Sequence, residues 1–556
     1  MNFDYVEKLA SGILHLTGHG GWYCISVFLL GFFVLFSIIP FFGLIESERW
    51  RSFTGNEGWY LFFLATIILA CKLPTLILHQ CNPDESEWIA GAITLAKDLR
   101  FWHSVDGTTS GPLLFIPLLV VKLLTGHLGY ASAKLVNLIC WFFIYRLAYG
   151  IFSYYTGKEL ARIVLLPMIL FYCLLVHHFD FSYYQSEVLP VLLITTALYF
   201  YTRFRNGNHP RLKHLMIAVF LIGCIPFAKL QLVPVAFFIG TWMLIENFRN
   251  YAKWIIPAAL LPAVLCFIYL IATNLGGDFY HSYIQNNFNY SNQNLYGVRS
   301  NSFLKSIIQF PDWAFQLRHL GLYIWISLLA PAAMIVFISR KKYDLFKSQR
   351  SGFLFFSLLL LISFYSVIAP RNHFHHYFIV LFIPLGLMSG YSLIILLRSL
   401  TSIGEKRIAV ILFILLTCSS NLLQYNHFFY SMKHPDRSAE SELFVNFIRA
   451  HPVKGDRLAI WGWEPHYNVE TELPQGVRDA HTYYAIMSDD PYFLHRYAAD
   501  LNRNLPRYFL DATGPGNFFF KENKFRHENY PEVNAIIADK YSLVLEQDST
   551  RLYRLK

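Results

Sequence analysis

Apolar stretches of about 20 residues, the length that a helix needs to cross a bilayer, recur along most of the 556-residue chain. Hydrophobic residues make up 55% of the sequence and charged residues only 15%, with a mean hydropathy of +0.38. This composition excludes an ordinary soluble domain. We therefore predict a polytopic α-helical membrane protein with about twelve transmembrane helices. The expected spans are 22–44, 58–79, 134–154, 163–179, 186–202, 214–228, 230–247, 254–273, 319–339, 352–369, 377–397 and 408–430.

Lysine and arginine residues predict how these spans are oriented. They gather in alternate short loops, most densely at 203–213 and 340–350, and such residues are enriched on the cytoplasmic side. The outer face then carries the segment around Asp84, the loop 274–318 and the turn 370–376. Because this topology explains the net charge of +10, no nucleic-acid partner is expected.

Two further segments complete the expected architecture. The apolar run 112–125 would reverse the alternation of charged loops if it crossed the membrane, so we predict an interfacial helix along the outer surface, paired with a helix that begins near Asp84. After residue 430 the composition becomes more polar, and short strands such as Arg457–Trp461 and Tyr541–Leu545 appear among helical patterns. We predict a transmembrane domain over 1–430 and a small α/β domain over 431–556 on the outer, periplasmic side.

Three acids follow the second predicted span, where its helix should reach the outer surface, in the segment Asn82–Glu87. One interpretation is structural, because Asn82 can cap a helix and acids in the first turn complement the helix dipole. The other is catalytic, because Asp84 or Glu85 at the mouth of a membrane-embedded site can take protons from hydroxyls. Both can hold together, since a capped helix end fixes a carboxylate rigidly.

Other outer segments place acids beside hydroxyl and aromatic groups. Asp106 lies in a Gly- and Pro-containing turn, which predicts either sugar binding or an ordinary solvated turn. Asp180 and Tyr183 lie at the next outer turn, where tyrosine is typical of an interfacial belt. Glu187 begins an apolar span and is by default a functional hypothesis. Tyr283 lies in the amide- and tyrosine-rich loop 274–318, which predicts sugar contacts or a flexible loop equally well.

Two cationic segments are predicted on the same side. Lys229 interrupts an apolar stretch, where an ammonium is costly unless it meets an anion. The turn that begins at Arg371 also contains His375 and His376. Its histidines allow a metal site or a plain surface turn, but the neighbouring arginine and the lack of a nearby acid in the sequence favour phosphate binding.

In their order and sidedness, these motifs resemble those of the GT-C glycosyltransferases. The features that carry the resemblance are Asp84-Glu85 after an early helix, an interfacial helix behind Gly111-Pro112, and Arg371 followed by His376-Tyr377. The nearest branch is the bacterial one related to protein O-mannosyltransferases and to the aminoarabinose transferase of lipid A. One departure is that this branch has a lysine before the proline, whereas Gly111 precedes Pro112 here.

The resemblance implies a multi-pass enzyme of the bacterial inner membrane that transfers a sugar with inversion from a polyprenyl-phosphate donor. The acceptor would be a glycolipid, a glycan or a protein, the site would lie among membrane lipids and face the periplasm, and no metal cofactor would be needed. Asp84 would be the general base, which Glu85 helps to orient. The donor phosphate would be bound by Arg371, His376, Lys229 and His375. The sugar and acceptor would contact Asp106, Asp180, Glu187, Tyr183 and Tyr283.

Two other functions are compatible with the sequence. A transporter or lipid flippase would favour broken helices and charges near the middle of the membrane, whereas the charges here gather at one face. A polysaccharide polymerase or ligase would also use an outer arginine and histidine, but it would have no need of Asp84-Glu85 beside an interfacial helix. The residues do not identify the sugar or the acceptor.

Overall fold

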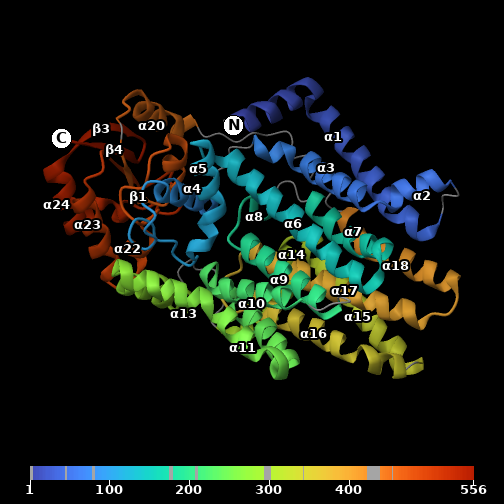
Figure 1. Cartoon of the computed structure of the whole chain (residues 1–556). Helices are drawn as coiled ribbons and strands as arrows, with labels where there is room; N and C mark the ends of the chain where they lie inside the picture. Colours follow the sequence, from blue (N-terminus) through green and yellow to red (C-terminus); the bar gives the residue numbers. More distant parts are fainter. Residues whose placement is uncertain are drawn as a thin grey trace.

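The protein consists of a long helical bundle with a smaller domain at one end (Figure 1). The computed structural model describes residues 4–43, 47–77, 82–174, 179–206, 211–292, 302–341, 343–422, 439–453 and 455–556. The predicted boundary between residues 430 and 431 lies outside these ranges. The long helices of the bundle are α1 (Asp4–Phe42), α3 (Glu57–Leu76), α6 (Tyr130–Thr156), α7 (Lys158–Leu174), α9 (Val188–Asn206), α10 (Leu212–Cys224), α11 (Val233–Thr273), α15 (Arg318–Lys341), α16 (Tyr343–Ile368), α17 (Ile379–Ser399) and α18 (Ile403–Leu422).

In its described part, each predicted span overlaps one of these helical segments, so the prediction of a polytopic helical membrane protein is confirmed. Six segments of the described chain are both long and apolar enough to cross a membrane: Gly20–Phe42, Glu57–Leu76, Tyr130–Thr156, Leu230–Thr273, Arg350–Ile368 and His375–Ser399. The segment His375–Ser399 lies at the centre of the bundle, because 94% of its most apolar stretch of 18 residues is buried. The same share for Gly20–Phe42 is only 22%. Glycines let α7 approach it closely, with Gly386 against Met168 and Gly390 against Val164.

Helix α11 is a helical run that folds back on itself. The end of α10 touches it at two distant points, since Ile222 lies against Gly240 and Gly223 against Ala259. On a straight helix these two points would be roughly 28 Å apart. The run therefore reverses between them, which agrees with the two spans predicted at 230–247 and 254–273. Its length of 44 residues with the preceding turn is about twice what one crossing needs.

Short helices cover the outer end of the bundle. Helix α4 (Pro83–Leu95) packs against η1 (Pro112–Phe115) and α5 (Ile116–Thr125), which forms the predicted interfacial pair. The predicted loop 274–318 is largely helical in its described part and contains α12 (Gly276–Phe279), η4 (Tyr280–Gln285), α13 (Asn286–Asn292) and α14 (Phe303–Gln316). Of the two alternatives left open for this segment, the flexible loop does not fit its described part, because α14 is strongly amphipathic and buries Phe310 and Trp313.

The C-terminal domain is built around a four-stranded sheet of order β1-β2-β4-β3. Strand β1 (Leu458–Gly462) runs parallel to β2 (Tyr508–Ala512), and β4 (Thr550–Leu555) is antiparallel to both β2 and β3 (Tyr541–Gln547). Helix α20 (Ala439–Ala450) covers one face, and α23 (Tyr492–Asn504) and α24 (Pro531–Lys540) cover the other. Helices α21 (His466–Thr471) and α22 (Tyr483–Met487) complete it. The predicted small α/β domain is confirmed.

Buried ion pairs fasten this domain to the outer end of the bundle. Arg496 lies 2.7 Å from Asp106 of the first outer loop and also binds Asp479 beside it. Arg478 binds Asp500 at 2.7 Å and reaches Asp278, at the start of α12, at 2.6 Å. Main-chain hydrogen bonds reinforce the contact, as between the Asp106 amide and the Arg478 carbonyl at 2.8 Å. In Figure 1, α4 and α5 lie between the sheet and the bundle.

We expect Arg496→Met to destabilise the docked domain by about 3–5 kcal/mol, because it leaves two carboxylates buried without their cation. The change can be measured as the unfolding of the full chain in detergent, followed by tryptophan fluorescence and by protease sensitivity of the C-terminal domain. Arg503→Met is the matched control. Its side chain is 47% exposed, and its buried partner Asp500 keeps Arg478 when Arg503 is lost, so the change should cost only about 0–1 kcal/mol. Equal losses in both variants would contradict the proposed fastening.

Candidate functional site

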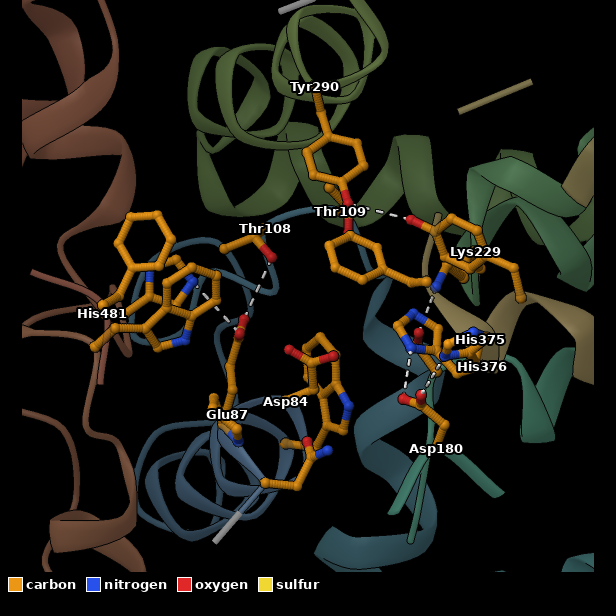
Figure 2. A pocket seen from close by; sticks show the side chains of 18 of the residues that line it. Asp84, Glu87, Thr108, Thr109, Asp180, Lys229, Tyr290, His375, His376 and His481 are labelled. Atoms are coloured by element: carbon orange, nitrogen blue, oxygen red, sulfur yellow. Dashed lines mark hydrogen bonds and ion pairs between the residues drawn. The ribbon is translucent and has the colours of Figure 1, made fainter. Parts of the chain in front are cut away.

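A cavity of about 420 Å³ lies where the bundle meets the C-terminal domain. Its walls come from the first turns of α4, the loop before η1, the turn before α9, the break between α10 and α11, the start of α17, and the C-terminal domain. Figure 2 shows that carboxylates, cations and aromatic rings from these distant segments point into the same space. The cavity is therefore the candidate site.

Asp84 projects into the cavity from the first turn of α4. Asn82 caps this helix, with its side chain accepting a hydrogen bond from the Glu85 amide at 3.0 Å, and Pro83 occupies the first turn. Both interpretations of this segment thus apply, since the cap holds Asp84 in place. Burial raises the pKa of Asp84, although the cations His376 and Lys229 oppose the shift. The carboxylate makes no hydrogen bond to another described side chain.

The other two acids of α4 point in different directions. Glu85 is fully buried beneath the helix, does not line the cavity, and accepts a hydrogen bond from the Tyr184 amide at 3.0 Å. Glu87 does line the cavity. Its carboxylate accepts a hydrogen bond from the Thr108 hydroxyl at 3.3 Å and lies 3.5 Å from Nε2 of His481. Burial raises the pKa of Glu87, and the neighbouring His481 opposes that shift.

Lys229 and two histidines form a cationic wall opposite Glu87. Lys229 lies between the short turns η2 (Ile225–Phe227) and η3 (Leu230–Leu232). Its ammonium binds Glu187 and Ser186 and lies 5.4 Å from the centre of the Tyr377 ring. The break between α10 and α11 therefore turns a lysine towards the cavity that a continuous helix would carry elsewhere.

The histidines come from η5 (His375–Phe378), which begins α17. Nδ1 of His376 lies 3.1 Å from Asp180, and its Nε2 lies 3.9 Å from Glu187. Nδ1 of His375 lies 3.9 Å from the other oxygen of Asp180. The inference that this turn has no nearby acid was wrong, because the acids arrive from the turn before α9. In Figure 2, Asp84 lies between this wall and Glu87 with His481.

Besides Glu85 and Glu187, four predicted residues do not line the cavity. Asp106 binds Arg496 and accepts a hydrogen bond from the Thr108 amide at 2.9 Å. Tyr283 is buried and donates a hydrogen bond to the Pro226 carbonyl at 2.6 Å. The two others are Tyr183, whose ring lies 4.4 Å from the Lys134 ammonium, and Arg371, which has a left-handed φ of 62° in the turn before η5. Glu187 also lies outside the lining but touches it through Lys229.

The C-terminal domain supplies a wall that was not predicted. It consists of His481 and the rings of Trp463, Tyr484, Phe518 and Phe519. Two further aromatic residues line the cavity, and the hydroxyl of Tyr290 lies 3.1 Å from that of Tyr377. No local sequence pattern marks His481. Its position follows only from the docking of the two domains.

A possible metal-ligand cluster lies elsewhere. Among the described residues, Asp511, His527 and Glu528 are the one group whose ligand atoms all lie within 4.8 Å of one another. Arg551 already binds this group, at 3.2 Å from Asp511 and 2.5 Å from Glu528. A guanidinium in this position takes up the negative charge that a metal would need, so the cluster fits a structural ion-pair network in the C-terminal domain.

Comparison with known proteins identifies a similar fold. No protein-family model matches the sequence, and no curated protein matches it. The solved structure of ArnT from Cupriavidus metallidurans bound to undecaprenyl phosphate is similar over 90% of this chain and 98% of its own, with a TM-score of 0.56 and 12% identity. The apo structure of the same protein matches with a TM-score of 0.52 and 12% identity, over 89% and 97% of the two chains.

A weaker likeness, with a TM-score of 0.45 and 10% identity, is found with the archaeal oligosaccharyltransferase AglB from Archaeoglobus fulgidus in complex with an inhibitory peptide and a dolichol-phosphate. It covers 82% of this chain and 70% of that one. The fold comparison depends on ArnT, the lipid A aminoarabinose transferase, because almost all of that chain is matched. The chain therefore shares the fold of ArnT, in agreement with the fold that its sequence resemblance predicts.

Proposed function

We propose that the protein transfers a sugar from a polyprenyl-phosphate donor to an acceptor hydroxyl, with inversion, on the outer face of a bacterial inner membrane. The observation that carries this proposal is the arrangement of one cavity, in which Asp84 faces a wall of Lys229, His375 and His376. A base and an anion-binding wall on opposite sides of one space are what a displacement at a phosphate-linked sugar requires.

Asp84 suits the role of general base. Its side chain lines the cavity, and burial raises its pKa towards the range in which a carboxylate accepts a proton effectively. Glu85 acts indirectly, because its bond to the Tyr184 amide holds the first turn of α4 against the bundle. Glu87 and His481 lie on the same side as the incoming hydroxyl and would orient it through hydrogen bonds.

The cationic wall suits the donor phosphate. Lys229 is 6% exposed and lies beside His376 at the outer end of the bundle, where a phosphate headgroup can reach while its prenyl chain remains among the helices. In the reaction, the acceptor oxygen forms a bond to the anomeric carbon and its proton passes to Asp84. The bond from that carbon to the phosphate oxygen breaks, and the phosphate leaves with the electron pair. Cations facing this oxygen stabilise the charge that develops on it.

The remaining predicted residues act on the cavity through its lining residues or lie outside it. Asp180 supports the histidines and Glu187 supports Lys229. Arg371 lies in the turn beside η5 and does not line the cavity. The fold of ArnT, whose solved structure holds undecaprenyl phosphate, supports a lipid-linked phosphate as the donor class.

We also propose that no metal cofactor takes part. Lys229, His375 and His376 place cationic groups where a divalent ion would act in a metal-dependent transferase, and an ammonium in this position opposes cation binding.

We expect Asp84→Asn to reduce transfer by about 10²- to 10⁴-fold, because the amide keeps the shape of the side chain but cannot accept the proton. The assay supplies a panel of polyprenyl-phosphate sugars and cell-envelope acceptors to the protein in liposomes and measures glycan transfer. Asp98→Asn is the matched control, since Asp98 is in the same outer segment but pairs with Arg100 at the surface. Transfer that survives Asp84→Asn would exclude this mechanism.

We expect Lys229→Met to weaken the binding of undecaprenyl phosphate by about 10- to 100-fold, through loss of a charge-assisted contact. Titration of the protein in nanodiscs measures this directly. Because Glu187 would lose its partner, the double variant Lys229→Met/Glu187→Gln shows whether a weakened fold is responsible. Lys253→Met, at an exposed position, is the control. Unchanged affinity in a folded double variant would remove Lys229 from the donor site.

We expect removal of divalent metals to leave transfer unchanged. The protein is dialysed against EDTA, and initial rates are compared before dialysis, after dialysis, and after Mg²⁺, Mn²⁺ or Zn²⁺ is added back. A loss of activity that one of these ions restores would show that a metal takes part in the reaction and that the cationic wall is insufficient.

A further inference from the structure

A second cavity, of about 480 Å³, lies in the C-terminal domain beside the candidate site. The same two chain segments, at residues 463–464 and 517–518, separate the two cavities. Trp463 and Phe518 line the first cavity, whereas their chain neighbours Glu464 and Asn517 line the second. The divider is held together, because the Glu464 carboxylate accepts a hydrogen bond from the Phe518 amide at 2.7 Å. A ligand in the second cavity would therefore lie next to one in the first.

Polar side chains dominate the second cavity. Glu464 and Asp548 provide carboxylates, Asn517 and Gln547 provide amides, and the turn between β3 and β4 provides the hydroxyls of Ser549 and Thr550. The rest of the lining consists of the rings of Tyr467, Phe444 and His466, together with Pro515 and Gly516. The side-chain oxygen of Gln547 is buried and has no hydrogen-bond partner among the described residues, although such groups are nearly always paired. This oxygen favours a ligand that donates hydrogen bonds.

We propose that the second cavity binds a neutral or amino sugar unit of the acceptor, so that the acceptor is a glycan of at least two sugars. This inference rests on the proposed function. The sugar with the reacting hydroxyl would lie beside Asp84, and the next unit would lie beyond Phe518, whose ring is 53% exposed at the divider and offers a flat apolar surface. Amides, carboxylates and hydroxyls match the donors and acceptors of sugar hydroxyls.

The charges of the cavity exclude anionic ligands. Within the part of the chain that the structure describes, no lysine or arginine contributes to the lining, and its histidine, His466, lies 3.1 Å from Glu464 and is thus already paired with an acid, while Asp548 adds a further carboxylate. A phosphorylated or acidic sugar would therefore be repelled. An extended peptide is also disfavoured, because peptides commonly bind by adding a strand to a sheet edge, and the cavity is lined by loops and by the β3–β4 turn rather than along a strand.

Two variants test the proposal without disturbing the divider. Gln547→Ala removes the unpaired oxygen, and Asp548→Asn keeps a side chain that tolerates the left-handed backbone at this position, where φ is 52°. Asp539→Asn, an exposed carboxylate on α24 with a side chain 69% accessible, is the matched control. Far-UV circular dichroism and gel filtration check that each full-length variant is folded.

The experiment measures retention of the purified full-length protein in nanodiscs on an array of mono- and oligosaccharides that are neutral, aminated or acidic, with peptides alongside. We expect neutral or amino oligosaccharides to retain the wild type, and Gln547→Ala and Asp548→Asn each to weaken retention about tenfold. Single sugars should bind much less. Retention only by acidic glycans or peptides, equal retention by single sugars, no retention at all, or variants that behave as the wild type would each overturn the proposal.

Asp84→Asn separates this inference from the proposed function. The array measures binding and not transfer, so this variant should still be retained by the same oligosaccharides while losing activity. If transfer survives Asp84→Asn but retention depends on Gln547 and Asp548, the mechanism fails and the glycan site stands. If Asp84→Asn abolishes transfer but the cavity variants bind normally, the mechanism stands and the glycan site fails.

Discussion

The buried pair of Lys229 and Glu187 is the interaction on which the site depends. It joins the break between α10 and α11 to the start of α9, and Glu187 also approaches His376 at the start of α17. Two charges at this depth are costly to bury, and each is tolerated only because the other is present. The pair therefore fixes three helix ends at one level and leaves the cationic wall facing Asp84.

Most of the transmembrane helices could be predicted from the sequence because a bilayer leaves the backbone little choice. Apolar runs of sufficient length must form helices that satisfy their own hydrogen bonds, and even the reversal within α11 was expected from the polar residues between its halves. The segment 274–318 was harder to predict. Its amides and tyrosines obscure the amphipathic pattern of α14, and packing against the bundle decides its structure.

The residues of the candidate site could likewise be predicted only in part. Asp84, Asp180, Lys229, His375 and His376 were predicted from local sequence, because a charge beside an apolar span is unusual enough to be noticed. Asp106 and Arg371 were equally conspicuous, yet Asp106 serves the docking of the C-terminal domain and Arg371 lies outside the cavity lining. Sequence shows that a charge is costly at a position, but only the tertiary structure shows which partner offsets that cost.

His481 could not be predicted at all, because its role depends on contacts between segments at opposite ends of the chain. Helix α4 binds the C-terminal domain through the Thr94 hydroxyl, which accepts a hydrogen bond from the Gln475 amide at 2.9 Å, and Glu87 meets His481 beyond it. In the proposed topology, α4 reaches the outer face early in synthesis, whereas His481 follows the last predicted span and reaches it late. The cavity is therefore completed only after all the predicted spans have been made, and a chain that stalls in the membrane before that point carries Asp84 in a half-open site.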